Sequence, residues 1–218
     1  MLGFKFRLDG VYFTTFRKPT STSLILSYSI PPYTTIRGLL ANALGMKRDD
    51  YSLQDWFKIG IKPLSFSNRS REMAKLLKLK GTGENYVRVF PSSPMFKEFL
   101  ISPAYEIYLA GDDEKIKQIH QALLQPERPL YIGTSDDLAD IELSKPTQIQ
   151  EISATKIFGV VEGVHEKCFV ESIPYKFIKK DSDFSLEYKT VSIPQNYIIT
   201  MKKEIECWGF NGENICLV

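Results

Sequence analysis

Alternating apolar and polar positions near the N-terminus predict a β-strand with one buried face. Phe4, Phe6 and Leu8 alternate with Lys5 and Arg7. This period of two residues places the three apolar side chains on the same side of a strand. We expect the segment to contribute one strand to a half-buried sheet.

The clearest helical pattern lies between residues 33 and 45. Its apolar positions follow the i, i+3, i+4, i+7, i+8 spacing of one helix face, and they are Ile36, Leu39, Leu40, Ala43 and Leu44. Thr34 can cap the start of this helix, and Gly45 can take the left-handed conformation just beyond its end. Arg37 is expected to point away from the buried face.

The other helices and strands expected in the N-terminal half follow one another in the order of a known fold. Strands are expected at residues 59–66, 105–109 and 130–132. A second helix is expected between Asp112-Asp113, which can cap it, and Pro126; the apolar residues sharing one of its faces are Ile116, Ile119, Leu123 and Leu124. The order strand, helix, strand, strand, helix, strand predicts an α+β, ferredoxin-like (βαββαβ, RRM-like) domain over residues 1–145.

A basic insertion interrupts this order at about residues 67–102. Its cations are Arg69, Arg71, Lys75, Lys78, Lys80 and Arg88. Residues 96–101 are expected to return as one arm of a hairpin. Residues 73–80 can alternatively form a short amphipathic helix whose lysines only face water.

From about residue 146 the pattern changes. β-Branched and aromatic runs, broken by Pro, Gly and Asp, predict a smaller, mainly β C-terminal lobe over residues 146–218. No Gly/Ser-rich or Pro-rich linker separates the two parts. They are therefore expected to pack together.

Composition narrows the class of protein. The chain has 218 residues, of which 43% are hydrophobic and 25% charged, as in a folded globular protein. No apolar run is long enough to span a bilayer or to act as a signal peptide, so we expect a cytoplasmic location and no membrane partner. The three cysteines form no CxxC pair and only two histidines are present, so no metal or other cofactor is expected.

Charge is divided unevenly along the chain. Residues 1–104 carry 16 Lys/Arg and 7 Asp/Glu, a net charge of +9, whereas residues 105–218 carry 12 Lys/Arg and 19 Asp/Glu, a net charge of −7. A strongly basic half favours a polyanionic partner, because bound phosphates release counterions. Ordinary unevenness of surface charge is the alternative.

Two segments resemble a known family. The run Ile-Pro-Pro-Tyr-Thr-Thr-Ile-Arg-Gly-Leu-Leu-Ala-Asn-Ala-Leu-Gly at residues 30–45 is similar to the first helix of the fifth family of CRISPR-associated proteins (the Cas five family). That family belongs to the RAMP superfamily of ferredoxin-like RNA-binding proteins. Residues 129–138, with Gly133 and Asp136-Asp137, resemble the family's glycine-containing turn. The resemblance spans roughly residues 1–141.

The resemblance implies a function and a set of partners. It predicts a non-catalytic subunit of a type I Cascade complex that holds the 5′ handle of the guide RNA (crRNA). The subunit would contact the repeated backbone subunit and adjoin the large subunit, and self-association is not required. The basic insertion would be a thumb that props the guide between handle and spacer.

Each candidate RNA-binding residue can also have a purely structural role. Backbone N–H groups at Tyr33 and Thr34, with Arg37, can seat a phosphate, or the residues only cap the helix. Tyr33 can stack an unpaired base, or it packs onto the helix. Arg17 and Lys18 can add phosphate contacts, or they lie in a solvated loop. The predicted RNA-binding residues are Arg17, Lys18, Tyr33, Thr34, Arg37, Arg69, Arg71, Lys75, Lys78 and Arg88.

Catalysis is the main alternative, because one branch of the resembling family cuts the repeat RNA with a neighbouring Lys-His pair and a Tyr. His120, with Lys117 three positions before it, is the candidate base of a metal-independent endoribonuclease. It fits a packed helix position better, and His165 reads as a turn residue. No Lys-His pair is adjacent, so no catalytic residue is assigned. A protein-interaction module that binds no RNA is the other alternative.

Overall fold

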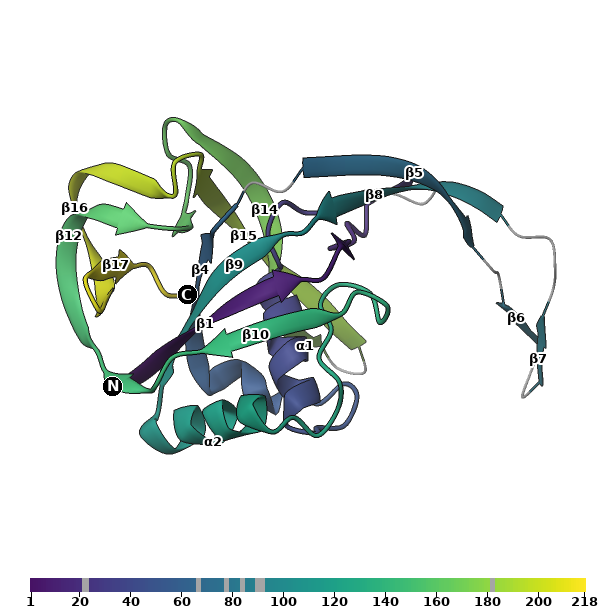
Figure 1. Cartoon of the computed structure of the whole chain (residues 1–218), viewed down its shortest axis with the longest axis horizontal. Coiled ribbons are helices and arrows are strands. Elements are labelled where there is room, and N and C mark those ends of the chain that lie inside the picture. The colour runs from purple at the N-terminus through teal and green to yellow at the C-terminus, as the bar shows by residue number, and fades with distance from the viewer. Residues whose placement is uncertain (21–23, 66–67, 77–78, 83–84, 89–92, 181–182) are drawn as a thin grey trace.

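An antiparallel sheet forms the centre of the computed structural model (Figure 1), which describes residues 1–20, 24–65, 68–76, 79–82, 85–88, 93–180 and 183–218. The strand order is β10 (Ala139–Leu143), β1 (Leu2–Gly10), β9 (Ala104–Gly111), β4 (Phe57–Pro63). All three pairings are antiparallel. A short strand β11 (Thr147–Gln148) also pairs with β1. The strand expected at the N-terminus is confirmed and lies between two neighbours.

Two α-helices, α1 (Tyr33–Ala43) and α2 (Asp113–Leu124), lie against one face of this sheet (Figure 1). The apolar spacing predicted both. Ile36, Leu39, Leu40 and Ala43 of α1 are buried in the same core as the β1 side chains, and Gly45 has a φ of +67° just beyond the helix. A 3₁₀ turn (η1, Ser52–Asp55) follows α1.

The two helices begin in different ways. Asp112 caps α2 as expected, because its carboxylate accepts hydrogen bonds from the N–H groups of Glu114 (3.1 Å) and Lys115 (3.2 Å). The prediction that Thr34 caps α1 is wrong: the N-cap position is Pro32, and no side chain caps it. The prediction that Leu124 lies on the buried face of α2 is also wrong, because the helix ends there and leaves the side chain exposed.

The fourth strand of the sheet lies further along the chain than predicted. Residues 130–132 form a loop with an isolated bridge from Tyr131 to Leu138, and the strand itself is β10. One carboxylate oxygen of the buried Asp137 shapes this loop by accepting the N–H groups of Thr15 (2.9 Å) and Thr134 (3.1 Å). Gly133, at φ +84°, approaches the Thr15 carbonyl too closely for any side chain.

The insertion forms an arm that projects from the body (Figure 1). Its main ribbon pairs β5 (Asn68–Leu76) with β8 (Ser93–Ile101) in antiparallel register. Short strands β2 (Phe13–Thr14) and β3 (Leu24–Ile25) pair with β8 on the other side. The hairpin return predicted for residues 96–101 is confirmed, and the alternative helix is wrong for residues 73–76, which belong to β5. Strands β6 (Leu79–Thr82) and β7 (Asn85–Arg88) form a separate pair.

The C-terminal residues are mainly β, as expected. Strands β12 (Gln150–Phe158), β16 (Ile198–Phe210) and β17 (Glu213–Ile215) close on themselves, while β14 (Cys168–Lys180) lies beside β15 (Asp183–Pro194) and β15 pairs with β13 (Val161–Glu162). Ile173, Val191 and Ile193 share the main core with α1. The C-terminal strands thus pack onto the N-terminal part, which was also expected.

A charged cluster covers part of the second face of the central sheet. The ammonium groups of Lys5 and Lys62 lie 2.6 and 3.0 Å from the carboxylate of Glu106, and both also pair with Glu213 of β17. The Tyr108 hydroxyl lies within hydrogen-bond distance of both carboxylates, at 2.9 and 2.7 Å. Burial opposes ionisation of Glu106 and Glu213, but these hydrogen bonds outweigh it and lower the pKa of both carboxyls. The C-terminal strands therefore occupy this end of the face.

Candidate nucleic-acid interface

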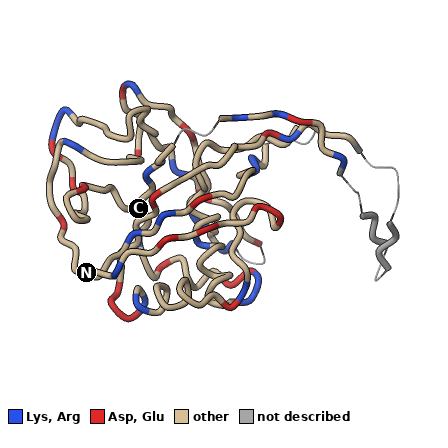
Figure 2. Tube along the Cα trace, viewed as in Figure 1, with Lys and Arg blue, Asp and Glu red and all other residues tan. Residues whose placement is uncertain are grey.

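One face of the arm gathers basic and apolar side chains. Four residues at every second position of β5 project to the same side of the ribbon. They are Arg69, Arg71, Met73 and Lys75. Phe96 of β8 pairs with Met73 in the register. Met73 and Phe96 are 66% and 50% exposed. Figure 2 shows Lys and Arg positions following the arm away from the body. We call these five residues the arm face.

A single buried carboxylate organises the base of the arm face. Arg69 Nη1 donates to Glu98 Oε1 at 2.8 Å, and Arg71 Nη2 lies 3.6 Å from Glu98 Oε2. Arg69 Nη2 also donates to Ser29 Oγ at 2.6 Å. Because both guanidinium groups share one carboxylate, the pair keeps a net positive charge, and the hydrogen bonds of Arg69 fix the orientation of its guanidinium.

Aromatic side chains beside the ribbon were not predicted as site residues. The rings of Phe13 and Phe99 lie 5.6 Å apart, and Lys97 Nζ lies 4.9 Å from the Phe99 centroid. Tyr12 is 75% exposed and has a φ of +67°. A left-handed conformation is unfavourable for a bulky residue. The sequence signal was the Tyr12-Phe13 pair, but only the β2–β8 pairing shows that it flanks the arm.

Arg17 and Lys18 both lie near the base of the arm, but Arg17 is exposed whereas Lys18 forms an ion pair. Arg17 is exposed, and its backbone forms a bridge to Ser27. Lys18 Nζ is 2.9 Å from Glu171 Oε1 and 5.0 Å from the Tyr28 ring centroid. Lys18 therefore ties its loop to β14, whereas Arg17 presents its charge to solvent.

Tyr33 and Arg37 lie inside the protein. The Tyr33 ring is 2% exposed and contacts Tyr175 of β14 edge-on, with centroids 5.7 Å apart. Burial raises the pKa of its hydroxyl. In this structure the ring is packed, which is the structural role given above as the alternative to base stacking, and RNA contact by Tyr33 stays a prediction. Arg37 is only 5% exposed, because β14 covers its side of α1, so it is buried although it lies off the apolar face of the helix.

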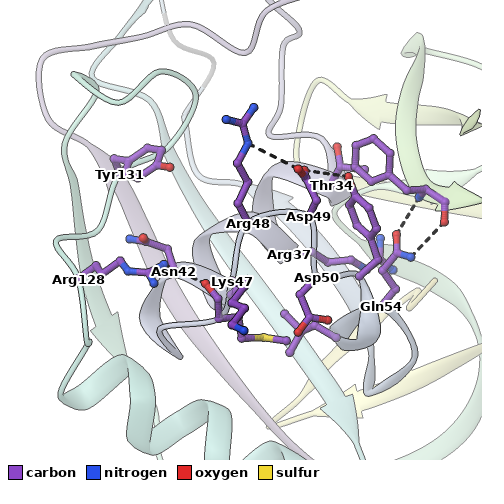
Figure 3. A pocket seen from close by; sticks show the side chains of 16 residues that line it. Thr34, Arg37, Asn42, Lys47, Arg48, Asp49, Asp50, Gln54, Arg128 and Tyr131 are labelled. Carbon is purple, nitrogen blue, oxygen red and sulfur yellow. Dashed lines mark hydrogen bonds and ion pairs between the residues drawn. The ribbon is translucent and has the colours of Figure 1, made fainter. Parts of the chain in front are cut away.

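A pocket of about 510 Å³ opens on α1 beside Arg37 (Figure 3). Thr34, partly exposed, lies on its helical wall. Two other predicted residues cannot be placed in any site. Lys78 lies outside the described residues, and Arg88 lies in β7, where only the backbone is described.

Both histidines have a ring nitrogen within hydrogen-bond distance of a backbone carbonyl oxygen. His120 Nε2 is 3.0 Å from the Ser144 carbonyl oxygen, and its ring contacts Phe4 edge-on at 5.1 Å, so it is a packed residue. His165 Nε2 is 3.0 Å from the Glu162 carbonyl oxygen in a turn.

Among the described residues, no group of three or more His, Cys, Asp or Glu is arranged to hold a metal ion. None of the described helices has the length and apolarity needed to cross a membrane.

Three solved structures share this fold over most of their length. A CRISPR RNA-guided surveillance complex contains a chain with a TM-score of 0.61 and 15% identity, covering 89% of this chain and 92% of that one. A structure described as a Cas protein has a TM-score of 0.55 and 16% identity, covering 91% and 98%. A CRISPR protein from Archaeoglobus fulgidus has a TM-score of 0.52 and 13% identity, covering 99% and 98%.

Sequence comparison gives the family. No curated protein matches the chain. The family described as CRISPR-associated protein (Cas_Cas5) matches residues 3–190, which include the central sheet, both α-helices, the arm and most of the β14–β15 hairpin. The resemblance noted at residues 30–45 is thus confirmed, and the chain belongs to the Cas_Cas5 family of CRISPR-associated proteins.

Proposed function

We propose that the protein is a non-catalytic subunit of a Cascade-type surveillance complex, and that it holds the 5′ handle of crRNA along the arm face. The arrangement that carries the proposal is the Arg69–Glu98–Arg71 cluster next to exposed Met73 and Phe96. Positively charged groups that track a backbone, beside apolar surfaces that accept bases, are typical of single-strand binding. Family membership and the shared fold support the assignment.

The central sheet limits where RNA can lie. We propose that its order, with both helices on one face, is a ferredoxin-like arrangement, as expected for residues 1–145. RRM-type domains bind RNA across the open face of such a sheet. Here Lys5, Lys62, Glu106 and Glu213 occupy part of that face and neutralise one another. The arm face is therefore the better surface for a polyanion.

Further basic residues near the arm face and two partner subunits complete the proposed function. Arg17 extends the basic surface at the base of the arm, and Lys78 and Arg88 are predicted to continue it. The repeated backbone subunit and the large subunit are the proposed protein partners, in the cytoplasm. Neither a cofactor nor self-association is required. The division into parts 1–145 and 146–218 stays a prediction.

Filter binding of a labelled repeat RNA in EDTA, at two salt concentrations, tests the proposal. The wild-type protein is expected to bind uncut RNA, more weakly at high salt. Arg71→Ala with Lys75→Ala should weaken binding about a hundredfold or more, since each of the two charge-assisted hydrogen bonds lost contributes roughly 1.5–3 kcal/mol. Lys203→Ala, which removes an exposed cation of β16, is the matched control and should bind normally.

Each alternative function predicts a different result in this assay. Specific cleavage that requires His120 would indicate an endoribonuclease. RNA binding that is absent even at low salt would indicate a protein-interaction module.

A further inference from the structure

Two of the three cysteines lie opposite each other at the open end of the β16–β17 hairpin. The turn of this hairpin is Asn211-Gly212, and both residues have a positive φ, +46° and +92°. Asn-Gly in this conformation is typical of the two-residue turn that joins antiparallel strands. Strand pairing reaches Trp208 and Ile215. One position further along the same register, Cys207 lies opposite Cys216.

The type of this cross-strand position suits a disulfide bond. The residues that flank a two-residue turn exchange backbone hydrogen bonds, and the pairs beyond them alternate between non-hydrogen-bonded and hydrogen-bonded. Counted from the turn, the two cysteines form a non-hydrogen-bonded pair, in which the Cα atoms are about 4.5 Å apart. The Cα atoms of disulfide-bonded cysteines are about 4.4–6.8 Å apart. A bond between Cys207 and Cys216 therefore fits the existing path of both strands.

Packing places the two cysteine side chains on the same face of the hairpin. Trp208 and Ile215 pack with Tyr108 of the central sheet. Cys207 and Cys216 pack instead in a separate apolar cluster formed by the C-terminal strands. Neighbouring residues of a strand point to opposite faces. The change of cluster therefore shows that this alternation continues through both cysteines.

All three cysteines are free thiols in this structure, and the two thiols of the pair differ in their access to solvent. Cys207 is 1% exposed, whereas Cys216 is partly exposed. Burial raises the pKa of the Cys216 thiol to about 12, with a contribution from the nearby Cys207, and burial also raises the pKa of the Cys207 thiol. Both thiols therefore stay protonated at neutral pH, which slows their oxidation. The disulfide is nevertheless favoured at equilibrium, because no stabilised thiolate opposes it.

The same hairpin holds the C-terminal strands on the central sheet. The Glu213 carboxylate of β17 pairs with Lys5 at 3.1 Å and with Lys62. Ile215 lies so close to Gly60 of β4 that a Cβ atom added to this glycine would be 2.5 Å from the Ile215 Cγ2 atom. A covalent bond at the open end of the hairpin would fix β17 to β16, and these contacts with it.

We propose that Cys207 and Cys216 are a redox-sensitive pair, which a small-molecule disulfide such as oxidised glutathione converts into a cross-strand disulfide. The thiolate of the more exposed Cys216 attacks the oxidant and releases one glutathione thiolate. The thiolate of Cys207 then attacks the Cys216 sulfur of the mixed disulfide and releases the second, a step that needs no contact with solvent. The two cysteines lose two electrons and two protons, and the oxidant takes up both as two molecules of reduced glutathione. The reaction does not depend on RNA binding.

Oxidised glutathione added to the folded full chain, at about pH 8.5 where more of each thiol ionises, tests the pair. Peptide mapping by mass spectrometry should place a bond between Cys207 and Cys216. Cys168, on β14, is the third cysteine, and Cys168→Ser is the matched control. This variant should form the same bond, with the loss of two hydrogen atoms in its intact mass and no thiol left to react with N-ethylmaleimide.

Two further variants interrupt the reaction at different steps. Cys207→Ala should stop at the mixed disulfide between Cys216 and glutathione, and Cys216→Ser should leave Cys207 reduced. Oxidation should raise the urea midpoint of wild type and of Cys168→Ser, because the bond restricts the unfolded chain, but not that of Cys207→Ala. The proposal is overturned if Cys207 and Cys216 of the wild type stay reduced, if the bond formed contains Cys168, or if it joins two molecules.

Discussion

Glu98 Oε1 accepts a hydrogen bond from Arg69 Nη1 at 2.8 Å across the β5–β8 ribbon. The same oxygen accepts the Ser27 N–H at 3.3 Å, so one carboxylate joins the arm to the β3 side of the body. The base of the arm is therefore fixed by polar contacts as well as by strand pairing. The stability of the base of the arm and its net charge therefore both depend on the side chain of Glu98.

Glu98→Ala should destabilise the protein by about 1–3 kcal/mol, because the buried Ser27 N–H would lose its acceptor and Arg69 would lose its carboxylate partner. Urea unfolding measures the change. Glu72→Ala removes an exposed acid from the other face of β5 and should stay within about 0.5 kcal/mol of wild type. Equal effects would show that Glu98 does not anchor the arm.

The arm face should determine how RNA affinity depends on salt. For a single strand, the slope of log K against log salt changes by about 0.7 for each phosphate that the protein neutralises. Arg71→Ala and Lys75→Ala should each reduce the slope by that amount, whereas Lys203→Ala should leave it unchanged. Identical slopes for all four proteins would place the RNA elsewhere.

Acid should destabilise the protein through the cluster on the sheet. The pKa values of Glu106 and Glu213 are lowered in the folded state from the usual 4.5. A carboxyl with a lowered pKa stabilises the fold above its unfolded pKa, and that contribution disappears as the pH falls below about 4.5. Melting temperatures at pH 7 and pH 4 should differ less in Glu213→Gln than in wild type. A difference of the same size in both proteins would contradict this.

His120→Ala should cost about 1–2 kcal/mol of stability, because it removes the edge-on packing against Phe4 and the hydrogen bond to Ser144. RNA affinity should not change, and no cleavage product should appear with either protein. Thermal unfolding and the filter-binding assay measure the two effects separately. Weaker RNA binding by a folded His120→Ala protein would return this residue to the functional site.

Two glycines should respond to alanine in opposite directions. Gly133→Ala should destabilise by about 1–3 kcal/mol, since its φ is +84° and the new Cβ would lie 2.5 Å from the Thr15 carbonyl oxygen. Gly38→Ala should stabilise by up to about 1 kcal/mol, because the helix gains a better residue in open space. Chemical denaturation of both variants checks the signs.

Local patterns predicted the elements that bury one regular face. The spacing of Ile36, Leu39 and Leu40 predicted α1, and the alternation of Phe4, Phe6 and Leu8 predicted β1. The segment at 130–132 was harder, because Ile132 is buried through the loop that Asp137 holds rather than through strand pairing.

Site residues depended on contacts between distant segments, which periodicity does not contain. Arg37 lies on the polar side of the α1 pattern, and only the arrival of β14 buries it. Likewise, the short sequence around Met73 and Lys75 is compatible with either a helix or a strand. The partner strand β8 decides between them, and it also places Phe96 beside Met73.

The arm leaves one strand with an open side. In the described part of the chain, β5 pairs with β8 alone, so its other edge presents unpaired backbone donors and acceptors. Such an edge can add a strand from another molecule, and positive side chains along it oppose this by repulsion. Salt screens that repulsion. High salt, which is expected to weaken the proposed RNA binding, should therefore also favour association of its molecules through β5.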